Sequence, residues 1–227
     1  SHCLWRCGDS KADRREISSK MLRDLPPSAL RLDIDRAALA ANWRVLDRLS
    51  GAACAGAAVK ANAYGIGARI AVPVLWQAGC RDFFVTYASE AADIIDLAPP
   101  ASISLLHGPL SPADAVWARE AGVRMVINSL EQARRWLEAG GGLCDVMVDT
   151  GINRLGLPIA ALGDDLVRRL EIDVLMSHLA SADEDVPLNA LQCARWQESR
   201  SALPHRRASL ANSAGITLGA AYHGALT

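Results

Sequence analysis

The sequence has no apolar run of the roughly 18 residues that a membrane helix needs, and its charged residues form no basic patch. It also has no internal repeat, low-complexity tract or inter-domain linker. The first two absences argue against a membrane or nucleic-acid partner. With 227 residues, 51% of them hydrophobic, and a net charge of −1, the chain has enough apolar side chains for one domain of about 200 residues.

Cysteine forms neither a disulfide framework nor a metal-binding pattern. Cys3 and Cys7 have a C-x-x-x-C spacing, but no second pair of ligands follows. Several of the others lie in or beside apolar runs, where a thiol behaves as a small core residue. We therefore expect reduced, structural cysteines, no metal and a cytoplasmic protein. The six positions are Cys3, Cys7, Cys54, Cys80, Cys144 and Cys193.

The first twenty residues lack the apolar core and cleavage site of a signal peptide. Met21 then opens a segment that resembles a natural start. We expect residues 1–20 to be a non-native or disordered extension and residues 21–227 to form the domain.

Short apolar runs alternate with helical patterns, which is typical of βα units and a parallel sheet. The predicted strands cover 53–60, 82–86, 102–106, 124–127, 145–149, 172–177 and 208–212. A parallel barrel closes with eight strands, and no convincing eighth follows. The sequence thus predicts an α/β barrel of the TIM (β/α)8 type that is incomplete at about seven strands, with an open sheet as the alternative.

Residues typical of helix starts and helix ends support this order of elements. An amphipathic helix is predicted over 37–49. The segment 129–132, Ser-Leu-Glu-Gln, has the pattern of a capping box, and Ser111-Pro112 places proline at a first helical position. Glycines stand where helices should end, at Gly79, Gly122 and Gly140.

Polar residues follow four of the predicted strands. Lys60 ends the first, Arg154 follows the fifth, His178 ends the sixth, and Asn212 and Ser213 end the seventh. In a parallel barrel the reactive groups lie at the C-terminal ends of the strands. We therefore expect these side chains to meet on one rim.

Lys60 follows the apolar run 57–59, where a charged ammonium is costly unless it is paired or its pKa falls. A lysine so placed can form a Schiff base. The alternative is a lysine that reaches along its stem to solvent. Taken singly, Arg154 could be a surface ion-pair partner, His178 a core histidine, and Ser213 a helix N-cap.

The segment 59–65, VKANAYG, resembles the lysine motif of alanine racemases. Three further segments are similar to blocks of that family in the same order: 148–156 (VDTGINRLG), 176–180 (MSHLA) and 210–215 (LANSAG). The resemblance spans about residues 29–223. It implies pyridoxal-phosphate-dependent racemisation of L- and D-alanine, which supplies D-alanine for cell-wall peptidoglycan.

The resemblance also implies residue roles. Lys60 would carry pyridoxal phosphate and act as one of two bases that move the α-proton of the substrate. Tyr64 and Ser213 would contact the phosphate, and Arg154 would face the phenolic oxygen of the cofactor and the carboxylate of the substrate. His178 would lie by the pyridine ring. The implied cofactor-binding set is Lys60, Tyr64, Arg154, His178, Asn212 and Ser213.

The sequence departs from the family in several places. The second base of the family is a tyrosine from a C-terminal β domain of the partner subunit in a homodimer, and this chain ends before such a domain. None of its own tyrosines, Tyr64, Tyr87 and Tyr222, matches that position. Ile66 occupies a position where the family usually has histidine. Met147 occupies a position where many members have a lysine that becomes carbamylated and orients the arginine equivalent to Arg154.

These departures lead us to expect little or no racemase activity from the chain alone. The alternatives are a barrel that binds pyridoxal phosphate without catalysis and a structural fragment without a cofactor.

Overall fold

The computed structural model describes residues 32–227. The chain divides into two units, Ser1–Ile34 and Asp35–Thr227. The predicted extension over residues 1–20, with Cys3 and Cys7, lies outside the described residues. All elements named below belong to the second unit.

The predicted parallel sheet is confirmed. Its strands are adjacent in the order β1-β2-β3-β4-β5-β7-β8, and every pairing is parallel. The unpredicted β6 (Leu157–Pro158) pairs with β5 off this path and is too short to show a hydrophobic period. The other bounds are β1 Ala57–Ala58, β2 Phe83–Val85, β3 Ile103–Leu105, β4 Arg124–Ile127, β5 Leu143–Asp149, β7 Glu171–Met176 and β8 Arg207–Ser209.

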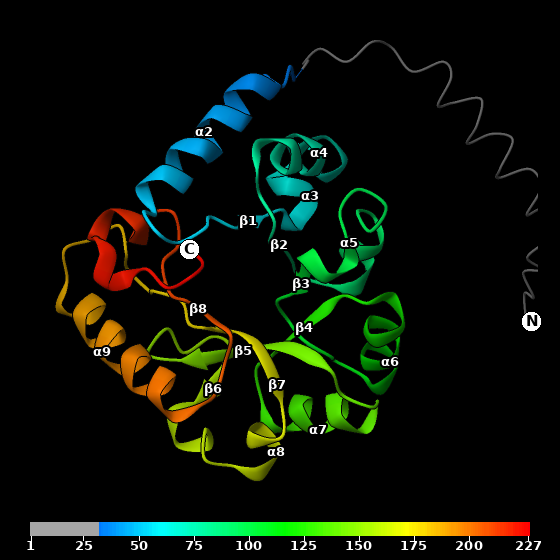
Figure 1. The fold of residues 1–227 in the computed structure, drawn as a ribbon, viewed down its shortest axis with the longest axis vertical. Coiled ribbons are helices and arrows are strands. Elements are labelled where there is room, and N and C mark those ends of the chain that lie inside the picture. The colour runs from blue at the N-terminus through cyan, green and yellow to red at the C-terminus, as the bar shows by residue number, and fades with distance from the viewer. Residues whose placement is uncertain (1–31) are drawn as a thin grey trace, which may run out of the picture. The chain divides into compact units, whose positions relative to one another are not determined.

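The last residues of the chain lie between the two edge strands of this sheet. Leu226 forms parallel bridges with Cys54, just before β1, and with Ser209 in β8. Thr227 N–H donates to the Cys54 carbonyl at 3.0 Å, and Ala225 N–H donates to the Ala208 carbonyl at 2.9 Å. The last residues therefore join the segment just before β1 to the second half of β8, and the C-terminus lies beside β8 and α2 (Figure 1). No strand of the described chain pairs with both β1 and β8 toward their C-terminal ends.

Helices surround the strands (Figure 1). The predicted first helix is α2, where only Trp43 is buried, and the proline start after Ser111 is confirmed as a complete capping box. The other predicted box is only half formed, because Ser129 caps α7 but the Gln132 side chain bonds elsewhere. The bounds are α2 Arg36–Leu49, α3 Lys60–Tyr64, α4 Ala68–Ala78, α5 Ala88–Ala92, α6 Pro112–Ala121, α7 Leu130–Glu138, α8 Asp165–Arg168 and α9 Pro187–Ala202. Short 3₁₀ turns are η1 Pro100–Ser102, η2 Ile159–Ala161, η3 Gly215–Leu218 and η4 Ala220–Tyr222.

Apolar side chains cover both faces of the sheet. The larger cluster packs strands against the outer helices and includes Phe83, Ile103 and Trp136, each with at most 2% of its surface exposed. A smaller cluster, with Val126 and Met147 among its members, packs the inside of the curled sheet. Burial on both faces is the reason that the strands read as continuous apolar runs in the sequence.

An ion-pair network occupies the inside of the sheet near the N-terminal ends of the strands. Arg124 pairs with Asp82 at 2.8 Å and with Asp173 at 2.9 Å, and its Nε lies 3.4 Å from Asp145. Arg207 pairs with Asp82 and Asp173 at 2.8 and 2.7 Å. Burial raises the pKa of Asp145, whereas hydrogen bonds from Arg207 and Arg124 outweigh burial and lower the pKa of Asp82. No local sequence pattern signals this network, because its members lie far apart in the chain.

The cysteines within 32–227 are free thiols, as expected. Cys80 and Cys144 are buried, and burial raises the pKa of Cys80 to about 12. Over the same residues, no group of three or more potential ligands could hold a metal ion, and no helix is long and apolar enough to cross a membrane.

Candidate active site

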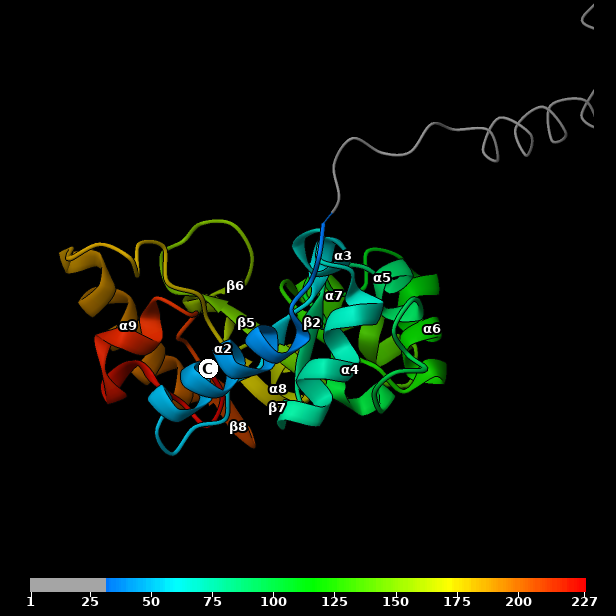
Figure 2. The ribbon, with the colours of Figure 1, turned by 90° about the horizontal axis from the view of Figure 1, so that it is seen from above.

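The predicted site residues all follow strand ends at one edge of the sheet. Lys60 comes directly after Val59 at the end of β1, Arg154 follows β5, His178 follows β7, and Ser213 follows β8. Figure 2 shows α3, the loop after β5 and the beginning of α9 on the same side of the molecule. The parallel sheet thus places these segments on a common rim.

Lys60 opens a left-handed turn. Four consecutive non-glycine residues have φ between 49° and 53°: Ala61, Asn62, Ala63 and Tyr64. Such a conformation costs roughly 1–2 kcal/mol for each L-residue, so surrounding contacts must hold it. Asn62 Oδ1 supplies one of them by accepting from Ala68 N–H at 2.7 Å, which also caps α4.

Positive charge gathers at this rim. His178 is partly buried, and its pKa is lowered first by burial and then by the charges of Arg154 and Lys60. His178 is therefore within electrostatic reach of both Arg154 and Lys60. Neither Lys60 nor Arg154 forms an ion pair with a residue of the described chain. Two positive charges of this kind favour a bound anion and disfavour the protonated form of the His178 imidazole.

The loop that carries Arg154 has a defined shape. Asp149 Oδ1 accepts from Gly151 N–H at 2.9 Å and from Asn153 N–H at 3.1 Å. Gly156 has φ +121°, and a Cβ there would come within 2.6 Å of the Asp149 nitrogen and 3.1 Å of a Met147 side-chain carbon. Met147 therefore packs beneath the loop through an apolar contact, and backbone hydrogen bonds shape the segment that presents Arg154.

The predicted phosphate ligands differ in availability. The Tyr64 side chain is 66% exposed and lies 6.0 Å from Lys60 Nζ, measured to the ring centroid. Ser213 is exposed as well, and within residues 32–227 neither hydroxyl has a hydrogen-bond partner. Asn212 Oδ1 accepts from Gly215 N–H at 2.8 Å, so its oxygen shapes the turn after β8 while its amide N–H groups stay available.

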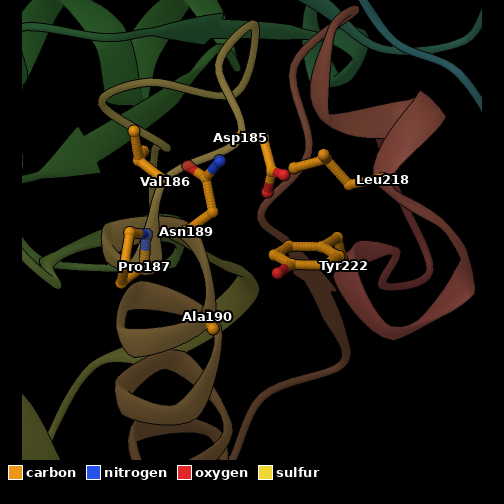
Figure 3. Close-up of a pocket in the computed structure, with 7 residues that line it drawn as sticks. All are labelled: Asp185, Val186, Pro187, Asn189, Ala190, Leu218 and Tyr222. Carbon is orange, nitrogen blue, oxygen red and sulfur yellow. The ribbon is translucent and has the colours of Figure 1, made fainter.

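The other two tyrosines pack against other parts of the chain. Tyr87 contacts the His107 ring edge-on at a centroid distance of 4.9 Å. Tyr222 lines a cavity of about 430 Å³ beside α9, together with Asp185 and Leu218 (Figure 3). None of the predicted site residues lines this cavity, nor a second one of about 460 Å³ between α2 and the start of β2. The candidate site thus lies outside both of these cavities, on a rim where Tyr64, Arg154 and Ser213 are exposed and Lys60 and His178 are partly buried.

These features define an α/β barrel with a lysine at the end of the first strand and a cationic rim. The chain belongs to the alanine racemase family: residues 34–227 match the family described as "Alanine racemase, N-terminal domain". It is 42% identical to an alanine racemase of Rhizobium meliloti over 207 residues and 45% identical to one of Rhodospirillum rubrum over 206 residues. These matches cover 87% and 85% of this chain but 54% of each relative, so the chain spans about half their length.

A solved structure gives the same assignment. The alanine racemase of Bartonella henselae with covalently bound pyridoxal phosphate is 32% identical, with a TM-score of 0.78, and the match covers 85% of this chain and 59% of that one. The fold prediction is thereby confirmed as the barrel part of an alanine racemase.

Proposed function

We propose that this chain is the pyridoxal-phosphate-binding part of a cytoplasmic, homodimeric enzyme that interconverts L- and D-alanine and supplies D-alanine for the cell wall. The observation that carries the proposal is the grouping of Lys60, Arg154 and His178 at the C-terminal ends of β1, β5 and β7. The solved relative from Bartonella henselae supports it, because its pyridoxal phosphate is covalently bound.

The donor set of the rim fits this cofactor. The aldehyde of pyridoxal phosphate forms a Schiff base with a primary amine. Lys60 has such an amine, and it forms no ion pair with another residue of the described chain. A phosphate dianion needs hydrogen-bond donors, which the exposed hydroxyls of Tyr64 and Ser213 supply. The planar guanidinium of Arg154 suits the phenolic oxygen of the cofactor and the carboxylate of the substrate.

When bound, pyridoxal phosphate supplies an electron-withdrawing ring that acidifies the α-carbon of an amino acid. Lys60 Nζ takes or returns the α-proton on one face of that carbon. Arg154 holds the substrate carboxylate, and His178, whose pKa is lowered by burial and by the charges of Arg154 and Lys60, lies beside the cofactor. Tyr222 lines a cavity that Lys60 does not line.

The proposal is tested by covalent trapping. The chain is mixed with pyridoxal phosphate, reduced with borohydride, digested and analysed by mass spectrometry. The sequence has three lysines, Lys11, Lys20 and Lys60, so the peptide that carries the label identifies the site. We expect label on Lys60, and none on that peptide in Lys60→Ala. Label spread over Lys11 and Lys20, or no label at all, would refute the proposal.

A turnover assay separates catalysis from binding. We expect the unreduced chain, loaded with pyridoxal phosphate, to racemise L-alanine slowly or not at all when it is alone. Adding the C-terminal half of the Rhizobium meliloti relative should raise the rate. Trapping without any turnover under both conditions would favour the second candidate, a non-catalytic barrel that binds the cofactor. The position of Tyr222 in a cavity without any predicted site residue also favours this candidate.

A further inference from the structure

Three helix side chains each form hydrogen bonds with two neighbouring strand-end loops. They are Glu90 in α5, Gln132 in α7 and Gln192 in α9, and we call them the rim bridges. Each reaches a loop on the strand before its helix and a loop on an adjacent strand. The two glutamines are buried, and Glu90 is half-buried.

Glu90 links the loops after β1 and β2. Its Oε1 accepts from Ala61 N–H at 2.8 Å, and its Oε2 accepts from Thr86 N–H at 2.6 Å. Ala61 is the first residue of the left-handed turn and immediately follows Lys60. The hydrogen bonds to Thr86 and Ala61 outweigh burial and lower the pKa of Glu90, so both of its oxygens remain acceptors at neutral pH.

Gln192 links the loops after β5 and β7. Its Nε2 donates to the His178 carbonyl at 3.0 Å and to Thr150 Oγ1 at 3.2 Å, and its Oε1 accepts from Ala180 N–H at 2.9 Å. The bond to Thr150 is buried and the other two are partly buried, so leaving these groups without a partner is costly. The segment that carries His178 and the start of the loop that carries Arg154 are thereby tied to one side chain.

Gln132 makes the same kind of link between β3 and β4. Its Oε1 accepts from Asn128 N–H at 2.8 Å, and its Nε2 donates to the His107 carbonyl at 2.7 Å. These two loops carry none of the predicted site residues. Gln132 is therefore an internal reference for the structural cost of losing a rim bridge.

We propose that Glu90 and Gln192 are positioning residues for the cofactor site, in which Glu90 holds the Lys60 turn and Gln192 holds the His178 and Arg154 loops. This inference rests on the proposed function. The physical reason is that reactive groups must be held within about half an ångström, and a strained left-handed turn keeps its shape only while outside bonds determine it. The Gln132 bridge contributes to stability alone.

The test compares Glu90→Ala, Glu90→Gln, Gln192→Met and Gln132→Met in the whole chain. Glutamine at 90 keeps one acceptor, so its effect should be smaller than that of alanine. We expect the rate of trapping at Lys60 to fall roughly tenfold in Glu90→Ala. Affinity for pyridoxal phosphate should fall by a similar factor in Gln192→Met, and Gln132→Met should match the wild type in both. All four should melt at a lower temperature.

Amide hydrogen exchange without the cofactor measures directly whether the bridged loops open more often in the variants. Exchange should quicken over 60–67 and at Thr86 in the Glu90 variants, and over 177–180 and at Thr150 in Gln192→Met. If Gln192→Met does not fold, Gln192→Glu replaces it, since glutamate keeps the bond from Ala180 but cannot donate.

The two proposals fail in different ways. A wild-type chain that takes no label at Lys60 contradicts the proposed function, and the exchange pattern then decides whether the bridges hold their loops. Label at Lys60 in the wild type with equal losses of rate and affinity in Glu90→Ala, Gln192→Met and Gln132→Met would overturn the positioning role. Unchanged local exchange in the Glu90 and Gln192 variants would overturn it as well.

Discussion

Arg207 and Asp82 form a two-point ion pair across the start of β1. Nη1 of Arg207 lies 2.8 Å from Oδ2 of Asp82, and Nη2 lies 2.8 Å from Oδ1. The pair joins the beginning of β8 to the residue before β2, which are 125 positions apart in the chain. It therefore holds the two edges of the curled sheet together from the inside, near the point where Leu226 bridges them from the backbone.

Replacing Arg207 with methionine should destabilise the chain by about 2–3 kcal/mol, because Asp82 and Asp173 would lose a buried partner. The loss stays below the usual upper range, since Arg207 is 29% exposed and Arg124 still pairs with both aspartates. Arg206→Met is the matched control, because its pair with Glu171 is exposed and worth less than about 1 kcal/mol. Urea unfolding measures both, and equal losses would contradict the closing role of Arg207.

The pKa of His178 should lie below its ordinary value of 6.5, first because of burial and then because of Arg154 and Lys60. The stability that neutral His178 provides is complete above pH 6.5 and is lost as the pH falls through the lower folded-state value. Arg154→Met should raise this pKa part of the way, and Arg154→Lys should leave it low. NMR titration of the His178 ring protons measures the shift, with Arg168→Met as the control for loss of a distant charge. An unchanged titration in Arg154→Met would show that the two groups lie far apart.

Glycine at position 61 should be neutral or stabilising by up to about 1 kcal/mol, because Ala61 has φ 49° and glycine adopts that conformation without steric cost. The same change at Ala41, an exposed position in the middle of α2, should cost about 1 kcal/mol. Thermal unfolding compares the two variants. Equal destabilisation would argue against the left-handed turn after Lys60.

Alanine at Gly156 should cost at least about 2 kcal/mol, since it combines φ +121° with a Cβ 2.6 Å from the Asp149 nitrogen. The loop that presents Arg154 should loosen at the same time, which hydrogen exchange over 149–156 detects. Gly163→Ala is the control, because only an Arg168 side-chain atom at 4.0 Å is near, and it should change stability by less than about 0.5 kcal/mol. A Gly156→Ala variant as stable as Gly163→Ala would contradict the close approach.

Much of the fold is readable from the sequence, because the strands are buried on both faces and so appear as continuous apolar runs. The Ser111-Pro112 start of α6 and the glycine after it are local signals that the structure confirms. The rim was predictable for the same reason: parallel strands end at one edge, so residues that follow them are brought together. The lysine motif and the three blocks after it identified the family, which the match over residues 34–227 confirms.

Other features depend on contacts between distant residues, and the sequence holds no local sign of them. Arg124, Asp145 and Asp173 read as charges within apolar strands, and only the curvature of the sheet turns them toward one another. Gln132 fits a capping box by spacing, yet in the folded chain its side chain bonds to Asn128 and His107. The sequence by itself determined the order of the main strands and that Lys60 follows the first of them, although this strand is shorter than predicted and Lys60 is the first residue of α3. The tertiary structure alone decided how Lys60 is held, because the carboxylate that bonds its turn comes from a helix beyond the next strand.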